Sequence, residues 1–230
     1  MRLLVVGASS GIGRSVALAA ASDGIDVVAA ARRAERLDEL PVPTVVCDAR
    51  SADDCASVVA SAVSELGGLD TVVYAAGVSP LVAVADADAD VWHEILETNV
   101  VGAALVVRAA LPYLRAASGH AVFLSSDSVP RPYPGLVAYA ASKAALNTLV
   151  AGWRVECPEV TFTRVAVGPT LTGFADGWSP ERAAGYFARW EAEAYLSAGQ
   201  PIMTPDQVAA EVLHIVRSPA RLDEVVVRAR

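Results

Sequence analysis

Tyr139 and Lys143 have the residue types and the spacing needed for proton transfer. They lie four residues apart, so a helix that opens near Tyr139 would carry both side chains on one face. A phenol can give a proton to a carbonyl oxygen, and a nearby ammonium group stabilises the phenolate and lowers its pKa. The pair therefore indicates acid–base chemistry. Ordinary amphipathic spacing produces the same pattern, and that alternative stays open for the pair taken alone.

A glycine-rich turn near the start of the chain could cradle a phosphate group. Leu3 to Val6 form a short apolar run typical of a parallel strand, and Gly7, Gly11 and Gly13 follow it before a helical pattern begins. Glycine permits a tight turn and lets the backbone approach a pyrophosphate, while the first amides of the helix point at the anion. A purely structural turn would also need glycine.

Together these segments resemble the short-chain dehydrogenase/reductase family. Its glycine segment commonly has the spacing Gly-x-x-x-Gly-x-Gly, and its catalytic signature is Tyr-x-x-x-Lys with a serine thirteen positions earlier, where Ser126 stands. Asn99, with Gly102 shortly after it, fits the asparagine that the family carries in a long helix. The resemblance spans nearly the whole chain. It implies an α/β fold: a single doubly wound Rossmann-type domain over residues 1–230, with a seven-stranded, mainly parallel sheet and helices on both faces.

Three sites depart from the family pattern. Val6 stands where the family usually has a threonine. Tyr74 and Ala75 replace two asparagines, one of which usually ties this turn to a neighbouring strand, so that support is missing here. Pro169 follows Gly168, whereas the family usually has the proline first, so the backbone path of this loop is not predicted.

The resemblance also implies the catalytic roles. Tyr139 would be the general acid/base, and Ser126 would hold the substrate oxygen by a hydrogen bond. Lys143 would bond the nicotinamide ribose, and Asn99 would hold a water that links Lys143 to solvent. The implied catalytic residues are therefore Asn99, Ser126, Tyr139 and Lys143.

Two arginines favour NADP(H) over NAD(H). Arg32 and Arg33 follow the apolar run Ile25 to Ala31, where an acidic residue would hold ribose hydroxyls and arginine suits a 2′-phosphate. The alternative is two solvated arginines that open a surface helix. By resemblance, Asp48 and the next amide would contact the adenine. The expected cofactor-binding residues are Gly7, Ser9, Ser10, Gly11, Ile12, Gly13, Arg32, Arg33, Asp48, Ala49, Ala76, Gly77, Tyr139, Lys143, Gly168, Thr170 and Thr172.

Short apolar runs and apolar stripes at helical spacing predict the elements that position these residues. The expected strands are 3–6, 25–31, 42–47, 69–74, 121–126, 160–167 and 225–227, with helices between them. One long helix is expected over about 90–116, and another from Tyr139 to Cys157. Residues 173–203 are expected to cover the substrate as a lid, and ordinary packing of their aromatic side chains is the alternative. The helix of this segment is capped by Ser179, with Pro180 in the first turn and one side formed by Tyr186, Phe187, Trp190 and Ala194.

Composition limits the classes of function. At 230 residues with 54% hydrophobic residues, the chain fits one globular α/β domain, and its formal net charge of −8 argues against a nucleic-acid or anionic-membrane surface. No apolar stretch reaches the ~20 residues that cross a bilayer, and no secretion signal is recognised. Cys47, Cys55 and Cys157 indicate free thiols in a reducing cytoplasm, and no metal site is expected.

These observations lead to one expected function and to alternatives. The chain is expected to be an NADP(H)-dependent reductase, or the reverse alcohol dehydrogenase, acting on a mainly apolar ketone or secondary alcohol, with Asp127 as one charge at the pocket rim. The alternative is a non-catalytic NADP(H) sensor or scaffold. A third interpretation, an epimerase or dehydratase, would fit a longer chain. By analogy with the family, helices 90–116 and 139–157 would pair subunits into a homodimer or homotetramer.

Overall fold

A single seven-stranded parallel sheet forms the centre of the computed structural model, which describes residues 1–196, 199 and 201–230. The strand order is β3-β2-β1-β4-β5-β6-β7. Because the order reverses between β1 and β4, the fold has a switch point there, and ligands of such sheets bind at the carboxyl ends of the strands beside it. The strands are β1 (Arg2–Val6), β2 (Asp26–Ala31), β3 (Thr44–Val46), β4 (Thr71–Tyr74), β5 (His120–Ser126), β6 (Thr161–Val167) and β7 (Glu224–Val227).

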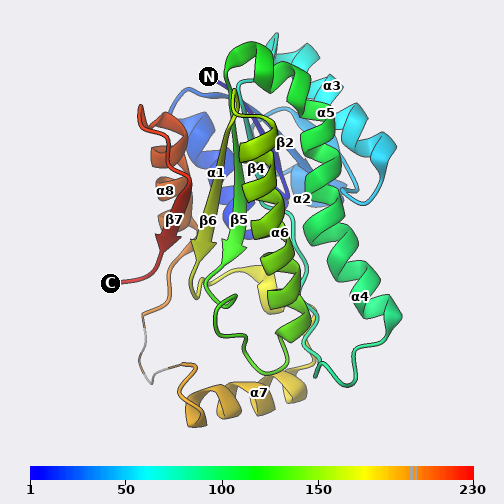
Figure 1. Cartoon of the computed structure of the whole chain (residues 1–230), viewed down its shortest axis with the longest axis vertical. Coiled ribbons are helices and arrows are strands. Elements are labelled where there is room, and N and C mark those ends of the chain that lie inside the picture. Colours follow the sequence, from blue (N-terminus) through cyan, green and yellow to red (C-terminus); the bar gives the residue numbers. More distant parts are fainter. Residues whose placement is uncertain (197–198, 200) are drawn as a thin grey trace.

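The expected α/β fold is confirmed, with helices on both faces of the sheet (Figure 1). One apolar core lies between the sheet and α3 (Ala52–Leu66), α5 (Gly102–Ala117) and α6 (Val137–Glu156). A second core lies on the other face, under α1 (Gly11–Ser22), α2 (Ala34–Leu37) and α8 (Pro205–Arg217). Burial on both faces explains why the strands read as continuous apolar runs.

The long helix predicted over about 90–116 is not regular along its length. It runs as α4 (Ala89–Leu96), a π-helical turn η1 (Glu97–Val101) and then α5. The combined helix Ala89–Ala117 is long and apolar enough to cross a membrane by length and composition, a test that the core helix of a soluble protein also passes. Here Ala103, Val106 and Leu114 pack into the core beside α3.

The segment after β6 crosses the carboxyl ends of the strands. It contains the short helix η2 (Gly173–Ala175) and α7 (Pro180–Ala192), which lies beneath the strand tips in Figure 1. Ser179 caps α7 and Pro180 opens it, as expected. Ala194 lies beyond the end of α7 with φ 55°, so the prediction that it shares the helix face was wrong. Residues 197, 198 and 200 of the expected lid lie outside the described residues.

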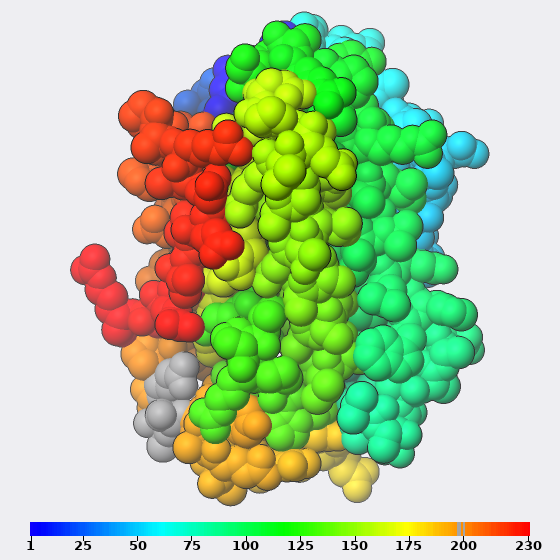
Figure 2. All heavy atoms as spheres, in the orientation of Figure 1, coloured from blue at the N-terminus to red at the C-terminus, as the bar shows by residue number. Residues whose placement is uncertain are grey.

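The loop after β5 holds α7 in place. Figure 2 shows this loop, in green, seated against α7, in orange, at the lower end of the molecule. The Trp190 indole donates a hydrogen bond to the Pro134 carbonyl at 2.9 Å, and the Arg131 guanidinium donates to the carbonyls of Glu193 and Ala194 at 3.0 Å each. Within the described residues, α7 is therefore held against the loop that follows β5.

Candidate active site

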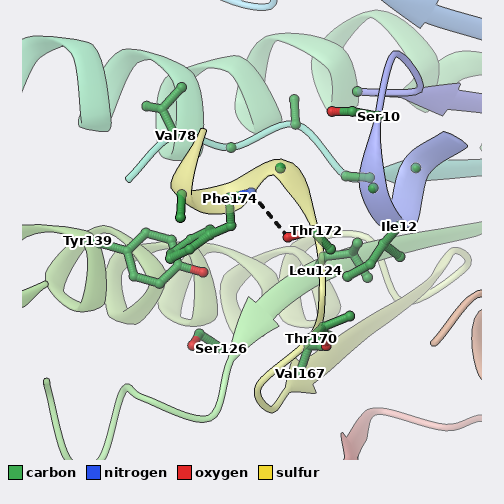
Figure 3. A pocket seen from close by; sticks show the side chains of 18 of the residues that line it. Ser10, Ile12, Val78, Leu124, Ser126, Tyr139, Val167, Thr170, Thr172 and Phe174 are labelled. Carbon is green, nitrogen blue, oxygen red and sulfur yellow. Dashed lines mark hydrogen bonds between the residues drawn. The ribbon is translucent and has the colours of Figure 1, made fainter. Parts of the chain in front are cut away.

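One cavity of ≈ 510 Å³ runs from the glycine turn after β1 to the aromatic side chains of α7. All the expected cofactor-binding residues line it, although their contacts with a cofactor remain predictions. Ser126, Tyr139 and Lys143 line it too. Figure 3 shows Tyr139 and Ser126 on one side of the cavity and Ser10 and Ile12 of the glycine turn at its far end. Asn99 is fully buried behind the cavity wall.

The glycine turn has the shape of a phosphate cradle. Gly7 has φ 94°, and a Cβ there would lie 2.4 Å from the Ala76 amide nitrogen, so no other residue fits. A Cβ on Gly13 would collide with the Gly7 carbonyl. Within the described chain, the Ser10 side chain caps no amide of α1, which leaves the first-turn N–H groups to face the cavity. This backbone suits a pyrophosphate.

Positive charge gathers at the tip of β2. Arg33 donates hydrogen bonds to the Ser9 hydroxyl at 2.8 and 3.1 Å and to the Ser10 hydroxyl at 2.8 Å, so it closes over the glycine turn. Partial burial, followed by the charges of Arg36 and Arg32, lowers the pKa of Arg33. Because the two serine hydroxyls carry no charge, these bonds leave the cation able to take an anionic ligand.

Asp48 lines the cavity, but its carboxylate already has a partner. Arg50 donates to both oxygens, with Nη2 at 2.6 Å from Oδ2 and Nε at 3.0 Å from Oδ1. The hydrogen bonds from Arg50 lower the pKa of Asp48, so the carboxylate is ionised at neutral pH. The expected adenine contact stays a prediction, and it would have to share this carboxylate with Arg50.

The Asn99 side chain joins three segments of the site. Its Oδ1 accepts from the Val78 amide at 2.8 Å, and its Nδ2 donates to the Val78 carbonyl at 3.0 Å and to the Ser142 hydroxyl at 2.9 Å. The turn Ala76–Val78 is thereby tied to α6, one residue from Lys143. A water relay through Asn99 remains a prediction, whereas the hydrogen bonds show that Asn99 holds the turn Ala76–Val78 against α6.

Tyr74, which replaces one of the family's asparagines, ties the end of β4 to the π turn η1. In the π turn, the Gly102 amide donates to the Glu97 carbonyl, five residues back, so the Thr98 carbonyl loses its ordinary α-helical partner. The buried Tyr74 hydroxyl donates to that carbonyl at 2.5 Å. A Cβ on Gly102 would collide with this hydroxyl, so the glycine makes room for it. The sequence carried one signal for this contact, the unusual Tyr74 itself.

Tyr139 and Lys143 lie together on α6, as the spacing predicts. The Lys143 Nζ lies 5.7 Å from the centre of the Tyr139 ring and donates to the Leu124 carbonyl at 2.8 Å. The Ser126 hydroxyl lies 2.8 Å from that of Ser128 and accepts from the Ser128 amide at 3.1 Å. Ser128 is buried, lines the cavity and was missed by the sequence analysis.

Burial dominates the electrostatics of these groups. It raises the pKa of Tyr139 to about 12, against a smaller opposing effect of the Ser126 hydroxyl. Burial also lowers the pKa of Lys143 to about 8. Desolvation opposes both charged forms and sets the direction of both shifts, and the expectation that the lysine lowers the phenol pKa stays a prediction. At neutral pH, Tyr139 is protonated and Lys143 is mostly charged.

An apolar wall closes the end of the cavity that holds Tyr139. Phe174 packs edge-on against Tyr139 at 5.1 Å between ring centres, and Trp178 packs edge-on against Phe174 at 5.5 Å. Four large apolar side chains that line the cavity are nonetheless 40–63% exposed: Leu171, Phe174, Phe187 and Ile202. The Asp127 carboxylate at the rim accepts from Arg228 at 3.1 Å, so its charge is matched.

The loop after β6 leads to this wall. Its backbone path around Gly168 and Pro169 could not be predicted from the sequence. The Pro169 carbonyl accepts from the Met203 amide at 3.0 Å, and the Leu171 amide donates to the Met203 carbonyl at 2.8 Å. Thr172 then caps η2 by accepting from the Phe174 amide (Figure 3). Its side chain lies over Gly11, which brings this loop against the glycine turn.

Comparisons with known proteins agree with this geometry. A family model described as short chain dehydrogenase matches residues 2–183. The chain is 31% identical to a glycine betaine reductase of Emericella nidulans, over 99% of this chain and 18% of that protein. It is 37% identical to an 11-beta-hydroxysteroid dehydrogenase of Sesamum indicum, over 72% of this chain and 51% of that protein. It therefore spans less than two thirds of the length of either relative.

A solved structure of the closed form of serine dehydrogenase complexed with NADP+ is also similar to the whole fold. The match has a TM-score of 0.85 and 25% sequence identity, and it covers 100% of this chain and 95% of that chain.

Proposed function

Because the chain belongs to the short-chain dehydrogenase family, an oxidoreductase family that uses nicotinamide cofactors, we propose that it is an NADP(H)-dependent reductase of apolar ketones. The same site would run the reverse oxidation of a secondary alcohol. The observation that carries the proposal is the meeting of Tyr139, Ser126 and Lys143 in one cavity with the glycine cradle. A binding module would not need these groups beside a cofactor cradle.

The charge at the tip of β2 supports the choice of NADP(H). Arg33 lies across the glycine turn, and Arg32 lies beside it on the cavity wall. A 2′-phosphate would lie near the positive charges of Arg32 and Arg33 there, whereas the ribose hydroxyls of NAD(H) need an acidic partner that the tip of β2 lacks.

The chain supplies the proton and the orientation for the reaction. The cofactor supplies a hydride to the carbonyl carbon when it is bound. The Tyr139 hydroxyl gives its proton to the carbonyl oxygen, while Ser126 donates a hydrogen bond to the same oxygen. The charged Lys143 stabilises the phenolate that remains. A protonated Tyr139 at neutral pH suits the direction of ketone reduction.

The apolar wall supports a bulky, uncharged substrate. Exposed apolar side chains that gather in one cavity mark a surface meant to be covered by a ligand. Leu171, Phe174, Phe187 and Ile202 form such a group, and the charge of Asp127 is already matched by Arg228. Flat aromatic ketones would gain ring contacts with Phe174 and Trp178.

A fluorescence titration with NADPH and NADH tests the cofactor assignment. Arg33→Ala should weaken NADPH binding about 10- to 100-fold, the value of a charge-assisted contact of ~1.5–3 kcal/mol, and should leave NADH binding unchanged. Arg108→Ala, an exposed arginine on α5, is the matched control. Equal loss for the two nucleotides, or tighter NADH binding by the unaltered chain, would contradict the NADP(H) assignment.

Turnover of benzil, an aromatic diketone, with NADPH tests the activity itself. Oxidation of NADPH at a rate that depends on benzil supports the reductase. Tight NADPH binding with no turnover of benzil or of a quinone would favour the non-catalytic sensor or scaffold. We also propose a cytoplasmic homodimer or homotetramer paired through α5 and α6, and light scattering that shows a monomer would contradict that assembly.

A further inference from the structure

Among the described residues, the only recorded hydrogen-bond partner of the Ser128 hydroxyl is the Ser126 hydroxyl. Ser128 lies two residues after Ser126, is 5% exposed and lines the same cavity. Its amide donates to the Ser126 Oγ at 3.1 Å, and its own Oγ lies 2.8 Å from that atom. One buried residue therefore occupies two of the hydrogen-bonding positions around the Ser126 oxygen.

The direction of the hydroxyl contact decides what Ser126 can do. A serine oxygen has two lone pairs and one hydrogen, and the Ser128 amide takes one lone pair. If Ser126 donated to Ser128, no proton would be left for a substrate oxygen. If Ser128 donates instead, both lone pairs of Ser126 are filled and its hydrogen is left for an acceptor in the cavity.

The neighbouring phenol selects between these directions. Tyr139 lines the same cavity as Ser126, and in the proposed reaction its hydroxyl becomes a phenolate beside the substrate oxygen. A phenolate or a substrate carbonyl can only accept, so Ser126 must donate to it. The remaining lone pair of Ser126 is then open only to the Ser128 hydroxyl.

We propose that Ser128 is a positioning residue whose hydroxyl, by donating to Ser126, directs the Ser126 proton at the reacting oxygen. This inference rests on the proposed role of Ser126 in the reductase. Ser128 itself need not touch the substrate. Its effect is to hold a donor in the orientation used during proton transfer, which should appear in kcat rather than in substrate binding.

The test is a double-mutant cycle on the full chain, assayed with NADPH and benzil. Ser128→Ala should lower kcat and kcat/KM together by about 5- to 10-fold, the value of one oriented hydrogen bond of ~1–1.5 kcal/mol. In a Ser126→Ala background the same change should have no further effect, because the group that it positions is gone. NADPH affinity and melting temperature should stay those of the unaltered chain.

Ser79→Ala is the matched control, because this buried serine lies outside the cavity lining and its hydroxyl has no recorded partner among the described residues. Unchanged or faster turnover in Ser128→Ala would overturn the inference, since it would mean that Ser126 had been donating to Ser128. An equal loss in both backgrounds would also overturn it. If Ser126→Ala were itself fully active, the proposed role of Ser126 would fail instead.

Discussion

At the scale of single residues, burial sets the chemistry of the site. Tyr139 is 9% exposed and Lys143 is 4% exposed, and burial raises the pKa of the phenol to about 12 and lowers that of the ammonium to about 8. The phenol is thereby kept protonated and the ammonium is made easier to deprotonate. A site of this kind is prepared to give a proton, which matches the direction proposed for the reaction.

The role of the phenol proton can be tested by removing the Tyr139 hydroxyl. Tyr139→Phe should reduce benzil turnover by about 10²- to 10⁴-fold, because the ring contact with Phe174 is kept and only the proton donor is lost. NADPH affinity, measured by fluorescence titration, should change little. Tyr113→Phe, on the exposed side of α5, is the matched control and should leave turnover unchanged. Substantial turnover in Tyr139→Phe would rule the phenol out as the acid.

At the scale of elements, the π turn is the feature that organises the site. It lies between α4 and α5 and carries Asn99, which holds the turn Ala76–Val78 against α6. A π turn leaves a helix carbonyl without its usual amide, and a buried carbonyl without a partner is costly. The Tyr74 hydroxyl satisfies the Thr98 carbonyl and so stabilises the turn from the end of β4.

Tyr74→Phe tests that contact. The change should lower the free energy of unfolding by about 1–3 kcal/mol, the cost of a buried acceptor left without a partner. Because the turn orients Asn99, NADPH affinity should also fall, and urea unfolding with a fluorescence titration would measure the two effects. Tyr133→Phe, whose hydroxyl donates to the Tyr195 carbonyl near α7, is the control for loss of a phenol hydrogen bond elsewhere. An unchanged free energy of unfolding in Tyr74→Phe would mean that the π turn does not depend on the Tyr74 hydroxyl.

At the scale of the whole molecule, the half-buried His120 links the last three strands. The Thr163 hydroxyl on β6 donates to the Leu222 carbonyl just before β7, so its oxygen accepts from Nε2 of His120 on β5 at 2.7 Å. Burial, with the nearby Arg221 charge, lowers the pKa of His120 to about 4. The His120 ring is therefore neutral in the folded protein at neutral pH.

This pKa predicts how stability changes with acid. The folded value lies below the usual 6.5, so the stability that depends on neutral His120 is present above pH 6.5 and is lost as the pH falls towards 4. His120→Gln keeps a donor for Thr163 and cannot be protonated in this range. Urea unfolding at pH 7, 5.5 and 4.5 should show a smaller loss for His120→Gln than for the unaltered chain. Parallel losses in the two proteins would place the acid sensitivity elsewhere.

The sequence by itself determined the fold class and the residues that line the cofactor cavity. The glycine turn, the arginines after β2 and the Tyr-x-x-x-Lys pair are local patterns, and parallel strands bring their carboxyl ends to one edge of a sheet. Motifs at those ends must therefore converge, wherever they lie in the chain. The bounds of the strands are predicted less accurately: the strand expected over 42–47 is only Thr44–Val46.

Only the tertiary structure decided how the convergent residues act on one another. The contact of Tyr74 with Thr98 joins segments 24 residues apart, and it depends on a π turn that no apolar pattern signals. The partners of Ser126 and Asp48, which are Ser128 and Arg50, depend on side-chain directions in loops. The pKa of Tyr139 depends on the side chains that bury it. Distances between remote segments and exclusion of water are properties of the packed chain, and no local spacing encodes them.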